Sequence, residues 1–189
     1  MAGKTNQTKN LILSTTIREI KENGYQTISL RKLLSQLNLT TGSFYKHFSS
    51  KNNLFENVAE IVSKRFSENA ERQLSQVQGD ALDELVTLGE FIISEIESDP
   101  NLTDFLLFNP SIIPVYLIES NIDTFELLKL THHIIAKLVK QRDLSQTENE
   151  LFVKVWAFIQ GYGSLISRGA VKYDRHLLLT AATQLIGEK

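Results

Sequence analysis

The stretch from Thr40 to Lys51 carries the densest set of side chains able to bind another molecule. It reads TTGSFYKHFSSK and holds hydroxyl groups, a phenol, an imidazole and two ammonium groups. Serine and threonine hydroxyls can hydrogen-bond to the edges of bases. Lysine, tyrosine and histidine side chains have the reach for the phosphates on either side. These residue types therefore favour contact with DNA.

The spacing of two phenylalanines predicts how this stretch is held in place. Phe44 and Phe48 lie four residues apart, so they share one face of a helix and can pack on the leucines of a preceding helix. The remaining side chains then point elsewhere, with small residues first and longer ones after them. We expect the DNA contacts to come from Thr41, Gly42, Ser43, Tyr45, Lys46, His47 and Lys51. The alternative is a polar helix face that is merely solvated.

The elements before this stretch predict a helix-turn-helix. Leu13, Ile17 and Ile20 recur at helical spacing, which predicts a helix over about 6–22 that ends at Asn23-Gly24. Ser29 can cap a second helix, and Asn38 can take the positive φ of a tight turn. A short third helix follows from Thr40 or Thr41 to Phe48. The inward face of the second helix should be Leu30, Leu33, Leu34 and Leu37.

The rest of the chain also reads as helical. A helix after Ser50 should run to about Gln73 and face inward with Leu54, Phe55, Val58, Ile61 and Val62. Further helices are expected over 80–98, 120–141, from a Ser145–Glu148 capping box to about Arg168, and over 174–186. The prediction is an all-α fold of about nine helices. A DNA-binding domain covers 1–51, a connecting helix 52–73 and a larger helical domain 79–189.

Charge is distributed unevenly along the chain. Residues 1–51 carry eight basic and two acidic residues, a net charge of +6. The remaining residues carry 12 basic and 20 acidic residues, a net charge of −8. A basic segment joined to an acidic one indicates that only the first segment meets a polyanion.

Several classes of function have no support in the sequence. There is no cysteine, no nucleophile-elbow glycine-serine pattern, no phosphate-binding loop and no dinucleotide glycine pattern. His132 and His133 are adjacent on a predicted helix and point about 100° apart, so one metal ion cannot easily take both. We expect no enzyme, no metal and no cofactor. The polar N-terminus and the lack of a long apolar run favour a cytoplasmic protein without a membrane partner.

The segment from Ile12 to Phe55, about a quarter of the chain, resembles the TetR (tetracycline repressor) family of transcriptional regulators. The matching residues are Gly24-Tyr25, Thr27, Leu33, Leu39-Thr40, Gly42, Phe44-Tyr45, His47-Phe48, Ser50-Lys51 and Leu54. The chain departs from the family at Thr15, Thr16, Leu34 and Leu37, where small alanines are common, and at Asn38, where glycine is common. The bulkier leucines imply altered packing between the first two helices.

The resemblance implies an all-α homodimer that binds a palindromic DNA operator and is released by a small effector. It places Tyr45, His47 and Lys51 on the DNA backbone, together with Thr27 and Arg31. It places Thr41, Gly42, Ser43 and Lys46 nearest the bases. Because the Lys46 side chain is also long enough to reach a phosphate, its contact stays open between base and phosphate.

In the C-terminal half, the segment 156–169 resembles the penultimate helix of the family, which lies in the dimer interface. Gly161, Gly163 and Ser164 would allow close packing of helices there. Candidate effector-pocket residues are Phe91, Phe105, Phe108, Tyr116, His132, His133, Phe152 and Trp156. Their aromatic character favours a largely apolar effector. Two alternatives stay open: these residues form ordinary core, and the regulator answers to a protein partner or to no effector.

Overall fold

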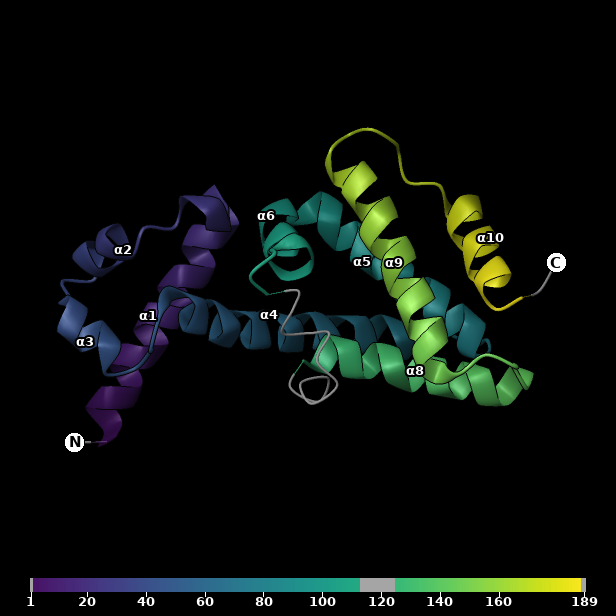
Figure 1. Ribbon diagram of the computed structural model, residues 1–189, viewed down its shortest axis with the longest axis horizontal. Helices are drawn as coiled ribbons and strands as arrows, with labels where there is room; N and C mark the ends of the chain where they lie inside the picture. Colours follow the sequence, from purple (N-terminus) through teal and green to yellow (C-terminus); the bar gives the residue numbers. More distant parts are fainter. Residues whose placement is uncertain (1, 113–124, 188–189) are drawn as a thin grey trace.

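The computed structural model describes residues 2–112 and 125–187, and these form an elongated all-α molecule (Figure 1). Nine α-helices and no strand occur within these ranges, as predicted. The elements are α1 (Ala2–Asn23), η1 (Tyr25–Thr27), α2 (Leu30–Gln36), α3 (Thr41–Tyr45), α4 (Lys51–Leu74), α5 (Ala81–Ser98), α6 (Pro100–Thr103), η2 (Asp104–Phe108), α8 (Glu126–Arg142), α9 (Glu148–Ser167) and α10 (Arg175–Leu185). We call α1–α3 the head and α5–α10 the body.

The head follows the predicted helix-turn-helix closely. Gly24 ends α1 with a φ of 78°, and Asn38 takes a φ of 53° in the turn between α2 and α3. Thr40 caps α3, because its hydroxyl oxygen accepts a hydrogen bond from the Ser43 amide at 3.1 Å. The helix itself ends at Tyr45, three residues earlier than predicted, and Phe48 lies in the turn that follows.

Two phenylalanines anchor α3, as the spacing predicts. Phe44 and Phe48 are 0% and 1% exposed, and their ring centroids lie 5.3 Å apart. In α2 only Leu33 and Leu34 are buried, whereas Leu30 and Leu37 lie partly exposed against the core. The prediction of a four-leucine buried face was therefore too wide, because a helix of two turns offers few fully covered positions.

Helix α4 connects the head to the body and packs against α1, α5 and α8 (Figure 1). Ser50 caps its start, since its hydroxyl accepts from the Asn53 amide at 3.0 Å. Leu54, Phe55, Val58 and Val62 are buried as predicted. Ile61 is 43% exposed, so its predicted inward position was wrong. Ile61 lies just outside the row of buried α4 side chains that packs against the body.

The capping box that opens α9 lies two residues beyond its predicted place. Thr147 is the N-cap, and its hydroxyl accepts from the Glu150 amide while the Glu150 carboxylate accepts from the Thr147 amide. These hydrogen bonds hold the pKa of the exposed Glu150 carboxyl below its usual range. The predicted Ser145–Glu148 box was wrong. It overlaps in sequence with the Thr147–Glu150 box, which has both reciprocal hydrogen bonds.

The other helix ends of the body match their sequence signals. Asp80 opens α5 through a capping box with Asp83, Pro100 stands in the first turn of α6, and Gly169 follows α9 with a φ of 69°. The first residues of the predicted 120–141 helix lie outside the described residues. No helix within the described ranges is long and apolar enough to cross a membrane.

Candidate nucleic-acid interface and ligand site

Helix α3 presents an exposed face at the end of the molecule far from the body (Figure 1). Thr41, Gly42, Tyr45 and Lys46 are exposed, and Tyr45 is 59% exposed. Ser43 and His47 are partly exposed. Because Phe44 and Phe48 point into the core, the polar side chains of α3 point toward solvent. The structure therefore brings the predicted residues of α3 onto one surface.

Gly42 is open to solvent and has no role in internal packing. Its φ is not positive, and a Cβ added there would meet only the Thr40 hydroxyl at 3.8 Å. The fold would thus accept a larger residue at this position. A glycine at an exposed site that the fold does not require suits a surface that another molecule approaches closely.

Lys51 has contacts within the protein that the sequence did not reveal. Its ammonium donates a hydrogen bond to the Ile28 carbonyl at 2.6 Å and lies 5.0 Å from the centre of the Phe55 ring. The lysine therefore ties the start of α4 to the segment before α2. Its predicted contact with phosphate stays a prediction, and the side chain also has a structural role.

The other two predicted backbone contacts lie near the start of α2. Thr27 and Arg31 are exposed. The Thr27 hydroxyl donates to the Asn23 and Gly24 carbonyls at 3.2 and 2.9 Å, which positions it beside the turn after α1. Arg31 and the neighbouring Lys32 extend the exposed basic surface of the head.

A group of polar contacts joins the head to the body. The Lys21 ammonium lies 2.6 Å from the Asp99 carboxylate, and the Gln26 amide donates to Asp104 at 2.9 Å. Asn101 donates to the Lys21 carbonyl at 2.9 Å. The end of α1 and η1 is thus attached to α6 and the π-helical segment η2. A movement of α6 or η2 would reach the head directly.

The predicted effector-pocket residues are dispersed through the body. Phe91 packs on Phe66 of α4, and Phe105 packs on Tyr25 and Phe55 at the junction with the head. Phe108 is partly exposed, His133 is exposed, and Tyr116 lies outside the described residues. Only Trp156 of the eight lines a cavity described below.

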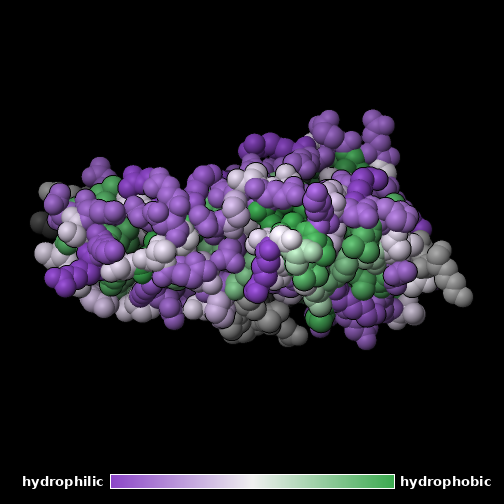
Figure 2. All heavy atoms as spheres, turned by 90° about the horizontal axis from the view of Figure 1, so that it is seen from above, coloured by the Kyte–Doolittle hydropathy of each residue, from purple (hydrophilic) through white to green (hydrophobic). Residues whose placement is uncertain are grey.

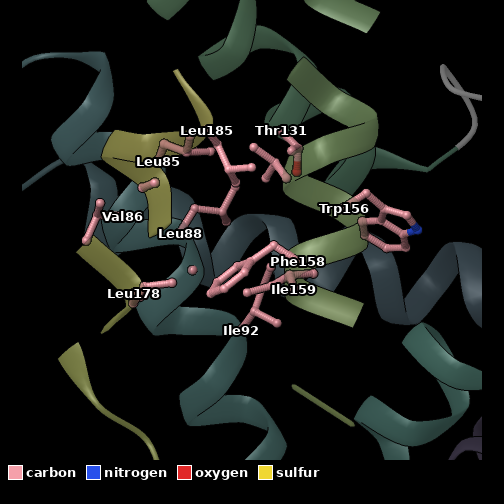
Figure 3. A pocket seen from close by; sticks show the side chains of 13 residues that line it. Leu85, Val86, Leu88, Ile92, Thr131, Trp156, Phe158, Ile159, Leu178 and Leu185 are labelled. Carbon is pink, nitrogen blue, oxygen red and sulfur yellow. The ribbon is translucent and has the colours of Figure 1, made fainter. Parts of the chain in front are cut away.

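That cavity lies between α5, α8, α9 and α10 and has a volume of about 40 Å³ (Figure 3). Its lining is almost wholly aliphatic and aromatic: Leu85, Val86, Leu88, Gly89, Ile92, Thr131, Val155, Trp156, Phe158, Ile159, Leu178, Ala182 and Leu185. The Thr131 hydroxyl donates to the Leu127 carbonyl at 2.8 Å, so it is already satisfied. Of the thirteen lining residues the sequence prediction included only Trp156, because most of the others are ordinary core residues drawn from four helices.

His132, Phe152 and Trp156 form a stack of rings beside the cavity. The rings of His132 and Phe152 lie 3.9 Å apart, and those of Phe152 and Trp156 lie 6.2 Å apart. The His132 Nε2 atom is buried and has no hydrogen-bond partner among the described residues. Burial lowers the pKa of this imidazole, while Glu148 acts in the opposite direction. Burial of the ring therefore disfavours the charged imidazolium, and His132 stacks on Phe152.

The outer side of α9 carries apolar and small residues exposed to solvent. Val153, Ala157, Gly161 and Leu165 follow one another at intervals of four, and Leu177 and Leu179 are exposed on α10. We call these six residues the α9–α10 surface; apolar side chains gather over this part of the body in Figure 2. Gly161 has open space around it and Ser164 is partly exposed, whereas a Cβ on Gly163 would lie 2.8 Å from Ile96. Gly163 therefore faces the body's own core.

A short helix with an exposed polar face, packed in a three-helix head and attached to an acidic helical body, is the architecture of helix-turn-helix DNA-binding proteins. Residues 12–58 match the family of bacterial regulatory proteins described as the tetR family. The match confirms, for this part of the chain, the resemblance found in the sequence.

The chain is similar to a curated protein and to many solved structures. It is 29% identical over 105 residues to the nucleoid occlusion factor SlmA of Photobacterium profundum, a match that covers 54% of this chain and 53% of that protein. The match thus spans about half the length of the curated relative.

Two similar structures contain ligands. RolR with resorcinol is 14% identical, with a TM-score of 0.71 over 100% of this chain and 92% of that one. The regulator FadR of Bacillus subtilis with stearoyl-CoA is 17% identical, with a TM-score of 0.68 over 95% of this chain and 98% of that one. At these identities the likeness establishes the fold alone.

Proposed function

We propose that this protein is a transcriptional repressor that binds a palindromic operator as a homodimer and is released by a small, largely apolar effector. One observation carries the DNA-binding part: the exposed face of α3, held by buried Phe44 and Phe48, combines small residues with Tyr45 and Lys46. In a major groove the small residues come nearest the bases and the longer ones reach phosphates. Such a role needs no catalysis, and its DNA partner implies a cytoplasmic location.

A dimer follows from the size of the recognition element. Five residues of α3 can read only a few base pairs, which is too little for tight, specific binding. Two copies related by a two-fold axis read two half-sites. The α9–α10 surface supports this proposal, because exposed apolar residues flank Ala157 and Gly161, where two helices can approach closely.

Selection from a pool of random duplexes tests the proposal. We expect an inverted repeat whose half-site centres lie about one helical turn apart or slightly more. Affinity should fall steeply with salt, because basic side chains displace counterions from phosphates. Sedimentation should show a dimer at micromolar concentration. A monomer that binds the selected duplex tightly would contradict the dimer, and a selection without any enriched sequence would contradict operator recognition.

A second candidate is a DNA-binding protein governed by a protein partner or by no effector. The small size of the cavity favours it, and so does the curated relative, whose name is that of a nucleoid occlusion factor. A thermal-shift screen with apolar compounds separates the candidates, since a ligand at a hundredfold excess over its Kd stabilises by about 2.7 kcal/mol. No shift with any compound would support the second candidate.

A further inference from the structure

The first helix of the head extends well beyond the core on which it packs. Helix α1 begins at Ala2, yet Ile12 is its first buried residue among those whose side chains the structure describes. At about 1.5 Å per residue, the helix therefore runs roughly 15 Å from its start before its side chains are covered. We call the segment Ala2–Asn10 the arm. The arm gains little stability from packing within the head, so its helix must be explained by another contact.

The arm lies beside the end of α3. The Lys9 ammonium lies 5.7 Å from the centre of the Phe48 ring, and Phe48 follows directly on the turn that ends α3. Burial raises the pKa of the Glu60 carboxyl in α4, and the positive charge of Lys9 acts in the opposite direction. Lys9 thus attaches the inner end of the arm to the region after α3 and to α4. In Figure 1 the N-terminus lies at the same end of the molecule as α3, far from α8, α9 and α10.

The exposed side of the arm carries amides. Asn6, Gln7 and Asn10 are exposed, and their side chains have no hydrogen-bond partner among the described residues. The sequence also places no carboxylate before Glu19, so no side chain of the arm repels a phosphate. Asparagine and glutamine amides donate hydrogen bonds to phosphate oxygens in protein–DNA complexes. The chemistry of the arm therefore suits the DNA backbone.

The dimensions of DNA decide which part of it the arm can touch. The major groove is about 12 Å wide and admits one helix, which in the complex proposed above is α3. The minor groove is about 6 Å wide, whereas an α-helix with its side chains is about 10–12 Å across. The arm therefore enters neither groove, and it can lie only over the phosphates that border them.

We propose that the arm holds the DNA backbone outside the base pairs that α3 reads, and that the amides of Asn6, Gln7 and Asn10 donate hydrogen bonds to phosphate oxygens there. The proposal rests on the DNA binding proposed above and adds a separate contact to it. Because these amides are neutral, they release no counterions when they bind. Such contacts strengthen binding to every sequence without making it more sensitive to salt. In this respect the arm differs from the lysines of the head.

A cycle of two proteins and two duplexes tests the arm. One duplex carries the selected operator with long flanks, and the other ends at the base pairs that α3 reads. Gln7→Ala/Asn10→Ala should bind the long duplex about tenfold more weakly than the wild type, the loss expected for two hydrogen bonds. Trimming the flanks should weaken the wild type by a similar factor and leave the variant nearly unaffected. Equal sensitivity of the two proteins to trimming would overturn the proposal.

Salt dependence separates this contact from a charged one. The slope of log affinity against log salt should be the same for the wild type and the double alanine variant. Gln7→Lys should instead raise the affinity and steepen the slope by about one unit. An unchanged affinity and slope in Gln7→Lys would show that the arm lies away from the phosphates. A loss of affinity that depends on the base sequence of the flanks would also overturn the backbone contact.

Matched controls separate a DNA contact from an effect on folding. Gln73→Ala/Gln184→Ala removes two exposed amides at the end of α4 and on α10, and this variant should bind the long duplex normally. The Tm of Gln7→Ala/Asn10→Ala should equal that of the wild type, because both side chains are exposed. A wild-type protein that enriches no sequence overturns the proposed repressor. The same cycle on a random-sequence duplex then decides the arm, since phosphate contacts do not depend on sequence.

Discussion

The head and the body of this protein place their candidate sites in opposite ways. In the head, the candidate contacts lie on one short helix and its flanks, and they point outward because Phe44 and Phe48 point inward. In the body, the cavity has walls from four helices, and no segment contributes more than five lining residues. A site on one helix can be altered one residue at a time. A site between helices changes whenever those helices shift.

Phe44 and Tyr45 give the largest contrast between packing and contact within the head. Phe44 is fully buried, so Phe44→Ala should cost about 3–5 kcal/mol of unfolding free energy and abolish DNA binding. Tyr45→Ala, at a position 59% exposed, should change stability by less than about 0.5 kcal/mol and still weaken DNA binding. Chemical denaturation and duplex titration measure the two effects. A clear loss of unfolding free energy in the Tyr45→Ala protein would contradict the assignment of Phe44 to packing and Tyr45 to DNA contact.

Lys51 and Lys46 come next, since the Lys51 side chain is hydrogen-bonded to the Ile28 carbonyl and the Lys46 side chain has no hydrogen bond among the described residues. Lys51→Ala removes the hydrogen bond to the Ile28 carbonyl and should cost about 2 kcal/mol. It should also weaken binding to every duplex and reduce the salt slope by about one unit. Lys46→Ala should leave stability unchanged and alter which operator is preferred. Unchanged stability and affinity in Lys51→Ala would refute both of its assigned roles.

A pair of glycines compares the head with the body directly. Gly163→Val adds carbon atoms where even a Cβ lies 2.8 Å from Ile96, so it should cost about 1–3 kcal/mol through overpacking. Gly42→Val enters open space and should leave stability within about 0.5 kcal/mol, because the two residues have similar helix propensities. Its DNA binding should nevertheless fall at least tenfold. Normal DNA binding by Gly42→Val would show that this face does not approach the bases.

The smallest expected effect concerns two adjacent histidines in the body. Burial lowers the pKa of His132 in the folded protein, so folding opposes its protonation. Its contribution to stability is complete above the unfolded pKa of about 6.5 and is lost as pH falls through the lower folded pKa. His132→Phe should reduce this loss, whereas His133→Phe, at an exposed position, should not. Denaturation measured from pH 8 to pH 5 provides the test, and equal slopes in all three proteins would contradict it.

Much of the fold could be predicted because its signals are local. Asn38 and Gly24 take positive φ values where turns were expected, and Ser50 and Thr40 act as caps. The errors also have local causes. Two possible capping boxes overlap near Thr147, and the sequence alone does not show which residue begins the helix. Ile61 lies at the edge of the buried face of α4, and the width of that face depends on the neighbouring helices.

The sequence by itself determined the helical class, the helix-turn-helix and the burial of Phe44 and Phe48, because helical spacing alone decides which side chains share a face. The tertiary structure decided everything that depends on the distance between helices. It brought the Ile28 carbonyl to Lys51, turned Gly163 inward, and dispersed seven of the eight predicted pocket residues away from the cavity or beyond the described residues. The cavity itself is lined mainly by leucines, isoleucines and valines that are indistinguishable in sequence from any other core, since a cavity is defined by the space that packing leaves unfilled.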